Sequence, residues 1–193
     1  MTTLYLVRHG ETTWNRERRI QGHRDPPLNE TGRWQAQALA EHLAGVCFDA
    51  AYASDLCRAR HTAEIILLRH NLPIETRTEL RERFLGRWEG LLIDDLPVVD
   101  SEAWQVWLTR PRNYAPHGGE TEVDLERRAV GAISSIANAH PFGTVLVVSH
   151  GGTIRATLNG WLGVDTHHTP NCGAYVIEAT PTERKLVDEI RLP

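Results

Sequence analysis

Two apolar segments, one near each end of the chain, stop abruptly in a histidine and a glycine. The first reads Leu4-Tyr5-Leu6-Val7-Arg8-His9-Gly10 and the second reads Val145-Leu146-Val147-Val148-Ser149-His150-Gly151. Short apolar runs that end in polar residues and glycine are typical of strands buried on both faces of a parallel sheet. Open sheets of this kind bind ligands just beyond the carboxyl ends of their strands. The two histidines are therefore predicted to share one site.

The remainder of the chain alternates helical and extended patterns, which favours a single domain over residues 1–193. The predicted helices cover about 29–46, 56–70, 123–139 and 153–162, and the further strands lie near 49–54, 73–76, 174–179 and 185–190. This order predicts a three-layer α/β/α domain with a mainly parallel central sheet and helices on both faces. At least one edge strand is allowed to run antiparallel.

Local details of two helices follow from the same patterns. Apolar residues recur at three- and four-residue steps and are expected to pack the first helix on the sheet; they are Trp34, Ala38, Leu39, Leu43 and Val46. Ser54 or Asp55 is expected to cap the second helix. Arg58 then lies in its first turn, where unpaired N–H groups already attract an anion.

Residues 91–117 follow neither period and are expected to form an insertion that covers the site. Trp104 and Trp107 are three residues apart, which indicates a small amphipathic helix docked on the core more than a cage for a ligand. The polar stretch from Arg16 to Arg24 is interpreted as a solvated loop, from which Gln21 and Gly22, with Asn15 just before it, are kept as site candidates.

Composition argues against several classes of partner. The chain has 21 basic and 25 acidic residues and a formal net charge of -4, which disfavours general attraction to nucleic acid or to an anionic membrane. Cys47, Cys57 and Cys172 form no C-x-x-C pair and predict no disulfide framework. The sequence carries no long apolar run and no basic leader, so we expect a cytoplasmic protein. A homodimer is compatible with the sequence, in which no motif encodes an oligomeric state.

The strand-end residues suggest a phosphate site. Arg8 and Arg58 carry planar guanidinium groups, each of which can donate two hydrogen bonds to the oxygens of one phosphoryl group. Two predicted helix amino termini face the same end of the sheet. The sequence has no HExxH, no calcium-binding loop and no phosphate-binding G-x-x-x-x-G-K, so we predict neither a metal nor a cofactor. A neutral imidazole is then the available nucleophile, but these arguments do not decide between His9 and His150.

Four blocks of the sequence resemble a known family. They are Arg8-His9-Gly10-Glu11-Thr12 with Asn15, Ser54-Asp55-Leu56-Cys57-Arg58-Ala59 with Thr62-Ala63, Leu80-Arg81-Glu82 with Gly86-Arg87-Trp88-Glu89-Gly90, and Ser149-His150-Gly151-Gly152. In this order they resemble the histidine phosphatase superfamily, to which cofactor-dependent phosphoglycerate mutases also belong. The resemblance spans nearly the whole chain.

The resemblance implies a role for each site residue. His9 is the implied nucleophile, which forms a phosphohistidine, and Glu82 is the implied proton donor, with Glu79 and Glu89 as rival acids. The implied phosphoryl ligands are Arg8, Arg58 and His150, and the secondary substrate contacts are Asn15, Gln21, Gly22 and the backbone of Gly151. These roles describe catalysis without a metal.

Within the family, the sequence favours the phosphatase branch. Mutases carry Gly-x-Leu-Gln-Gly where this chain has Gly86-Arg87-Trp88-Glu89-Gly90. The expected function is a metal-independent phosphomonoesterase that acts on small phosphorylated metabolites. Two alternatives stay open: a cofactor-dependent phosphoglycerate mutase, and a non-catalytic regulator that binds a phosphorylated ligand. The presence of His9 and His150 with Arg58 and Glu82 argues against the regulator.

The substrate itself is not encoded by any spacing. Specificity is expected to lie in the loop 16–24 and in the segment 91–117. The candidate contacts are His23, Arg24, Arg87, Trp104 and Tyr114. A metal site at His167 and His168 has weaker support, because their neighbours indicate an exposed turn.

Overall fold

A computed structural model describes residues 1–109, 111–166 and 168–191 of the chain. Within these ranges six strands form one sheet in the order β3-β2-β4-β1-β5-β6. The strands are β1 (Thr2–Arg8), β2 (Ala50–Ser54), β3 (Ile74–Arg77), β4 (Thr144–Ser149), β5 (Ala174–Ala179) and β6 (Arg184–Ile190). The neighbours from β3 to β1 pair in parallel, whereas β5 pairs antiparallel with β1 and with β6. The mainly parallel sheet is confirmed, and its antiparallel part lies at one edge.

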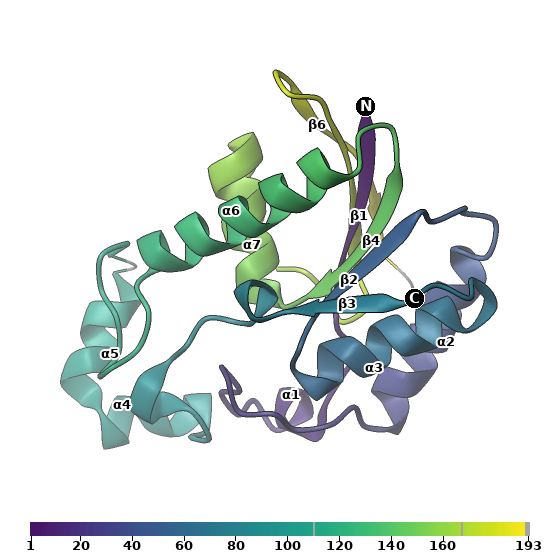
Figure 1. Cartoon of the computed structure of the whole chain (residues 1–193). Helices are drawn as coiled ribbons and strands as arrows, with labels where there is room; N and C mark the ends of the chain where they lie inside the picture. Colours follow the sequence, from purple (N-terminus) through teal and green to yellow (C-terminus); the bar gives the residue numbers. More distant parts are fainter. Residues whose placement is uncertain (110, 167, 192–193) are drawn as a thin grey trace.

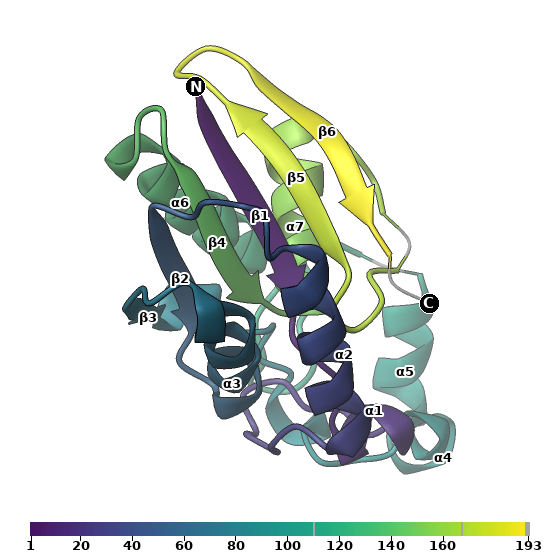
Figure 2. The same cartoon turned by 90° about the vertical axis from the view of Figure 1, so that its right-hand side faces the viewer.

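Helices cover both faces of this sheet (Figure 1). The α-helices are α1 (Thr13–Arg16), α2 (Glu30–His42), α3 (Cys57–Ile66), α4 (Leu96–Val99), α5 (Ser101–Leu108), α6 (Glu122–Ala139) and α7 (Gly151–Leu162), and the 3-10 helices are η1 (Leu67–Arg69), η2 (Thr78–Leu80), η3 (Gly86–Trp88) and η4 (Ile93–Asp95). Figure 2 shows α2 and α3 in front of the sheet and α6 and α7 behind it. Each face has its own buried apolar cluster, so the predicted three-layer domain is confirmed. Among the described helices none is long and apolar enough to cross a membrane.

Helix α2 packs through a different face from the one expected. Asn29 caps the helix by accepting a hydrogen bond from the Gly32 N–H at 2.8 Å. Gly32, Ala36 and Leu39 are buried, and they recur at steps of four and three residues. Trp34 is 59% exposed, so its predicted packing on the sheet is wrong. It lies two residues from Gly32, about 200° around the helix and thus on the opposite face.

Helix α3 is shorter than predicted and is capped from elsewhere in the chain. It ends at Ile66 and continues as η1. Ser54 and Asp55 do not cap α3. The Ser54 hydroxyl accepts from the Leu56 N–H at 3.3 Å, and the Asp55 carboxylate accepts from Arg81 at 2.8 Å. The first helical N–H, that of Cys57, instead donates to the Asp25 carboxylate at 2.8 Å. A cap separated by 32 residues leaves no local sequence signal.

The segment after η3 joins the polar loop near the carboxyl ends of the strands. Arg19 forms a β-bridge with Leu92, and Ile20 is buried in a cluster with Trp88. Figures 1 and 2 both show α1, α4 and α5 toward the end of the sheet to which β1 and β4 run. The ring of Trp107 lies 5.3 Å from that of Trp88, so the predicted docking of this small helix is confirmed. The prediction that the polar loop 16–24 is solvated is wrong at Ile20, whose side chain is buried with only 8% exposed.

Gly32 in α2 and Gly131 in α6 predict opposite effects of one substitution. A Cβ on Gly131 meets nothing within 4 Å, whereas a Cβ on Gly32 would clash with the Glu11 backbone. Alanine is the better helix former, so Gly131→Ala is expected to raise the free energy of unfolding by about 0.5–1 kcal/mol. Gly32→Ala is expected to lower it by about 1–3 kcal/mol, because the backbone must move. Urea denaturation of both variants tests this, and a stabilising Gly32→Ala would contradict the close approach.

Candidate active site

The register of β1 on β4 brings the two strand-end histidines together. Arg8 lies opposite Ser149, and the His9 N–H continues the ladder by donating to the Ser149 carbonyl at 3.0 Å. The rings of His9 and His150 have their centroids 5.1 Å apart, edge to face. Their exposed fractions are 2% and 0%. Residues 141 positions apart in the chain thus form one buried imidazole pair.

His9 is held in one orientation and one tautomer. Its Nδ1 lies 2.7 Å from the Gly10 carbonyl oxygen, and because a carbonyl only accepts, Nδ1 carries the proton. The lone pair on Nε2 is then available to attack. Burial, reinforced by the charges of Arg58 and Arg8, holds the pKa of His9 well below its usual 6.5. His9 is therefore a neutral imidazole at physiological pH.

Close backbone contacts fix the loop that carries His9. The Gly10 N–H donates to the Thr62 hydroxyl at 3.0 Å, and that hydroxyl donates to the Arg58 carbonyl at 2.7 Å. A Cβ on Gly10 would clash with the Gly32 carbonyl oxygen, so only glycine lets the loop touch α2. These contacts join the end of β1 to both helices of one face.

Arg58 is a buried cation whose outer nitrogens are paired with carbonyls. It is 1% exposed, and it donates from Nη1 to the Arg24 carbonyl at 2.7 Å and from Nη2 to the Gly22 carbonyl at 2.8 Å. Asp25 lies 3.8 Å from Nη1. Burial lowers the pKa of Arg58 to about 10, so the group stays charged at neutral pH. Gly22 has a φ of +50°, a conformation that favours glycine, and aims its carbonyl at this guanidinium.

Several buried polar atoms of the site find no partner within the described residues. They are the Nε atoms of Arg8 and Arg58 and both ring nitrogens of His150, four of the seven such side-chain atoms. Burial, with the charges of Arg58 and Arg8, lowers the pKa of His150 well below 6.5. Arg8 donates to the Thr169 carbonyl at 2.6 Å, which leaves its Nε unused. Buried polar groups are normally hydrogen-bonded, so these atoms indicate a site for a strongly accepting anion.

Glu82 is held at the amino terminus of α7. Its Oε1 accepts from the Arg83 N–H at 2.8 Å and its Oε2 accepts from the Gly152 N–H at 3.0 Å. A Cβ on Gly152 would clash with this carboxylate, so the glycine permits the approach. The Ser149 hydroxyl donates to the Leu80 carbonyl at 2.7 Å, which ties the segment that carries Glu82 to the end of β4. The carboxylate is thereby fixed against the strand ends.

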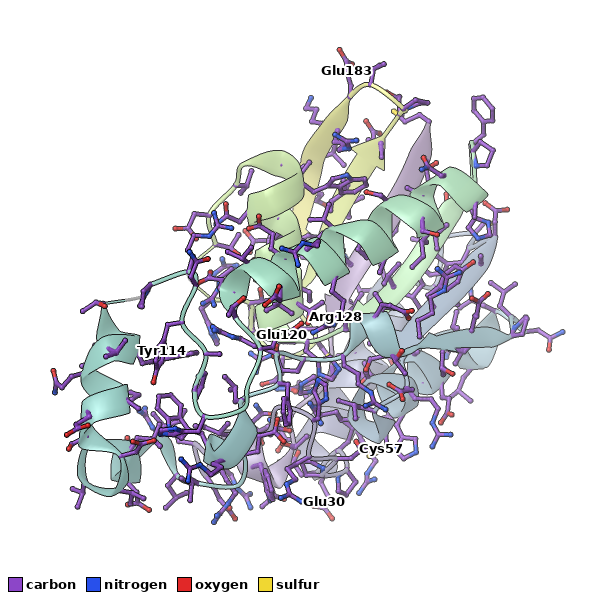
Figure 3. The ribbon with its side chains drawn as sticks, turned by 60° about the vertical axis from the view of Figure 1, so that its left-hand side comes forward. Glu30, Cys57, Tyr114, Glu120, Arg128 and Glu183 are labelled. Carbon is purple, nitrogen blue, oxygen red and sulfur yellow. The ribbon has the colours of Figure 1, made fainter. Side chains whose placement is uncertain are left out.

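The neighbouring helix α6 secures the same segment. Arg128 donates to the Arg81 carbonyl at 2.9 Å and forms an ion pair with Glu120 at 2.8 Å. Figure 3 shows Glu120 and Arg128 beside each other near the beginning of α6. The backbone before Glu82 is therefore anchored by α6 as well as by β4.

The two rival acids occupy other positions. Glu79 is exposed. Glu89 accepts from the His23 N–H at 2.8 Å and from the Leu85 N–H at 3.1 Å. A Cβ on Gly22 would clash with the Glu89 carboxylate. Glu89 thus positions the loop whose carbonyls hold Arg58, and it does not line the cavity that His9 lines.

A cavity of about 240 Å³ unites most of the predicted site residues. Its predicted lining residues are Arg8, His9, Asn15, Gln21, Gly22, Arg58 and Glu82. Gly151 lines a neighbouring cavity of about 200 Å³ that shares Arg8 and Glu82. His150 is fully buried with its ring 5.1 Å from that of His9, and it lines neither cavity. The structure therefore brings together all nine residues predicted from the sequence.

Asn15 and Gln21 belong to the rim of the cavity. Asn15 Oδ1 accepts from the Thr12 N–H at 3.1 Å in a capping box at the start of α1. Gln21 Oε1 lies 3.0 Å from the Thr12 hydroxyl. Since both amide oxygens face Thr12, their NH₂ groups remain available to a ligand.

For other residues near the site, the predictions from the sequence were incomplete or wrong. Arg155 and Arg83 line the cavity and were not predicted, whereas Arg19 and Ile93 belong to the two segments in which specificity was expected. Trp107 lines the cavity in addition to its docking role. Of the candidate specificity residues, Arg24 contributes its carbonyl to Arg58 and His23 contacts the Glu82 carbonyl at 2.9 Å. Arg87, Trp104 and Tyr114 do not line this cavity. His168 lines the second cavity, and His167 lies outside the described residues.

No group of three or more His, Cys, Asp or Glu side chains that could hold a metal ion occurs among residues 1–109, 111–166 and 168–191. The weaker hypothesis of a metal site at His168 therefore gains no support from its described neighbours. The ionisable groups that line the cavity are instead the imidazole of His9, several guanidinium groups and one carboxylate. This set can bind a phosphoryl group, attack it and protonate a leaving oxygen.

Comparison with known proteins agrees with this chemistry. The model of the histidine phosphatase superfamily (branch 1) matches residues 4–189. The chain belongs to the histidine phosphatase superfamily. It is 40% identical over 156 residues to "Phosphoglycerate mutase-like protein 4" of Arabidopsis thaliana, which covers 79% of this chain and 68% of that protein.

Other relatives carry phosphatase names. The chain is 35% identical over 165 residues to "Phosphoserine phosphatase 1" of Hydrogenobacter thermophilus, covering 86% of this chain and 78% of that one. The structure of a mycobacterial glucosyl-3-phosphoglycerate phosphatase solved with VO3 superposes with a TM-score of 0.87 at 31% identity, over 96% of both chains. The family and these relatives identify the chain as a phosphatase, a hydrolase of this superfamily.

The buried imidazole pair predicts how stability depends on pH. Because the pKa values of His9 and His150 lie below 6.5 in the folded state, the unfolded chain binds more protons as the pH falls through 6.5. The contribution of the two histidines to the free energy of unfolding is therefore fully present above pH 6.5. It decreases below that pH by up to about 1.4 kcal/mol per pH unit for each histidine. Urea denaturation at pH 7.5, 6.0 and 5.0 measures this slope.

The matched variants are His150→Asn and His42→Asn, the latter at the exposed end of α2. The first is expected to flatten the slope, whereas the second keeps the contribution of both buried rings. A free energy of unfolding that does not change between pH 7.5 and 5.0 would contradict the neutral pair.

Proposed function

We propose that the protein is a metal-independent phosphomonoesterase that acts on small phosphorylated metabolites through a phosphohistidine on His9. The observation that carries the proposal is the tautomer of His9, whose Nδ1 is occupied by the Gly10 carbonyl at 2.7 Å while Nε2 keeps its lone pair. The same cavity is lined by Arg8, Arg58 and Glu82. A nucleophile, two cations and an acid therefore face one space.

In the proposed binding step, a phosphoryl dianion supplies the acceptors that the buried cations need. The Nε atoms of Arg8 and Arg58 donate to its oxygens, as does His150, whose protonation the bound dianion favours. Each charge-assisted hydrogen bond contributes about 1.5–3 kcal/mol. His9 and His150 can thus hold opposite charge states in the complex, the first attacking and the second binding.

In the proposed chemical steps, His9 Nε2 attacks phosphorus and the bond to the ester oxygen breaks. Glu82 gives its proton to the departing alkoxide, so that the alcohol leaves neutral. Water then attacks the phosphohistidine, Glu82 takes the proton from that water, and inorganic phosphate is released with His9 restored. The hydrogen bonds of the Arg83 and Gly152 N–H groups keep the carboxyl group in place for both steps.

The remaining sequence predictions fit this proposal. Ile93 and Trp107 line the cavity, which supports a covering role for the segment 91–117. Names such as phosphoserine phosphatase among the relatives support a small monoester as substrate. The cytoplasmic location and the homodimer stay predictions.

Phosphate release from a panel of monoesters tests the proposal. We expect release that survives excess chelator, and transfer of ³²P from a labelled substrate to the protein as an acid-labile adduct. His9→Ala is expected to abolish both, because Nε2 is the attacking atom. His42→Ala, at an exposed position, is the matched control and keeps both.

Three outcomes would overturn parts of this proposal. An acid-labile adduct that survives in His9→Ala would move the nucleophile to another residue. Mutase product with little free phosphate, in the presence of phosphoglycerate and a bisphosphoglycerate primer, would establish the mutase alternative. Phosphate binding by wild-type protein without any turnover would favour the regulator.

The role of Glu82 predicts a dependence on the leaving group. Glu82→Gln keeps an oxygen that accepts from a backbone N–H but has no acidic proton, so alkyl phosphates should lose about 10²–10⁴-fold in kcat. Aryl phosphates have leaving groups that need little protonation and should lose much less. Steady-state rates of the variant with glycerol phosphate and p-nitrophenyl phosphate provide the test, with exposed Glu79→Gln as control. Equal losses for both substrates would refute the acid role.

A further inference from the structure

Five arginines line the cavity that contains His9, and four of them have assigned partners. Arg8 and Arg58 face the phosphoryl group in the proposed function. Arg83 donates to the Glu120 and Tyr114 carbonyls at 2.8 and 2.7 Å, and its guanidinium stacks on Trp107 at 4.7 Å. Arg19 donates to Glu17 at 3.0 Å and to the Gly90 carbonyl at 2.7 Å.

The fifth arginine, Arg155, makes no hydrogen bond and no ion pair with any described residue. It is half-buried in α7, three residues after Gly152 and four after Gly151. Residues at these spacings lie on one face of a helix. The side chain therefore lies one turn beyond the glycines that contact Glu82 and Arg8, on the cavity side of α7.

Arg155 is also the residue at which three cavities meet. It lines the cavity of His9, the cavity of about 200 Å³ around Gly151, and a third of about 260 Å³ that it shares with Arg83 and Trp107. Besides Arg155, the third cavity is lined by Arg83 and Arg112 against Glu122 and Asp165. Arg112 pairs with Glu126 at 2.6 Å and Arg83 donates to two backbone carbonyls, so Arg155 is the cation of this cavity whose donors no described residue occupies.

The in-line geometry of the proposed reaction places the leaving group on the side of the cavity where Arg155 lies. An in-line attack by His9 places the leaving oxygen on the far side of phosphorus, beside the acid that protonates it. Glu82 lines the two cavities that Arg155 also lines around the strand ends. A substituent on the leaving group that extends past Glu82 can therefore reach Arg155, which lines both cavities with it. A planar guanidinium with unused donors matches a carboxylate in a bidentate pair.

We propose that Arg155 forms a second anion site, which selects phosphate monoesters whose leaving group carries a carboxylate close to the ester oxygen. The inference rests on the proposed phosphatase function and names the substrate class of that same site. Arg155 is a specificity-determining residue that binds the substrate and takes no part in proton or phosphoryl transfer.

The test uses two substrates that differ only at one end. 3-Phospho-D-glycerate and sn-glycerol 1-phosphate share the phosphate, the carbon chain and the configuration of the middle hydroxyl, but the first has a carboxylate where the second has a hydroxymethyl group. We expect wild-type protein to favour 3-phosphoglycerate in kcat/KM by about 10- to 100-fold, the worth of one charge-assisted hydrogen-bond pair. Arg155→Met is expected to abolish this preference, and Arg155→Lys is expected to restore part of it.

Exposed Arg127, on α6 and paired with Asp124, provides the matched control. Arg127→Met should keep the wild-type ratio between the two substrates. Equal kcat/KM for the two substrates in wild-type protein, or a ratio that Arg155→Met leaves unchanged, would overturn the anion site.

Binding measurements separate this inference from the proposed function. Calorimetric titration of His9→Ala with both compounds measures selectivity without turnover, and tighter binding of 3-phosphoglycerate that disappears on adding Arg155→Met supports the site. If wild-type protein hydrolyses neither these esters nor p-nitrophenyl phosphate, the phosphatase proposal fails, while the titration still decides whether Arg155 selects a carboxylate. Equal affinities in the titration overturn the site whatever the activity.

Discussion

Two guanidinium groups buried beside two imidazoles are the constraint on which the rest of the structure depends. Cations with so little exposure are costly unless their donors are paired. The loop after β1 meets part of this need with the carbonyls of Gly22 and Arg24, which Arg58 contacts at 2.8 and 2.7 Å. The cations also keep His9 neutral by lowering its pKa. Arg8, Arg58 and His150 keep buried nitrogens without a partner among the described residues, and in the proposed function an anionic substrate supplies the acceptors.

The acid of the site depends on a different set of contacts, and this separation has a chemical purpose. His9 belongs to the loop that touches α2 and α3, whereas Glu82 is tied to β4, α6 and α7. In the proposed mechanism, the two reacting groups therefore reach the phosphoryl group from opposite faces of the sheet. Arg155 extends the second group of contacts by one helical turn. Attack and departure can therefore occur in line, with the leaving group directed into the cavities around α7.

Particular residues show why some predictions from the sequence succeeded and others failed. The strands that carry His9 and His150 were predictable because a short apolar run that ends in polar residues and glycine is typical of a buried strand in a parallel sheet. Trp34 was placed wrongly because Gly32, a small residue, decides which face of α2 touches the loop. Asp25 caps α3 from 32 positions away, so no local motif could announce it. Arg155 follows the last site block by three residues and looked like an ordinary helical residue.

By itself, the sequence determined the class of fold, the two strand ends that carry the chemistry and the family to which the chain belongs. These properties depend on local periodicity and on residue types at fixed spacing, which any chain displays before it folds. Only the tertiary structure decided the tautomer of His9, the role of Glu89 in holding a loop, and the free donors of Arg155. Each of these depends on which backbone groups a side chain meets after folding, and a hydrogen bond between distant segments leaves no trace in their spacing.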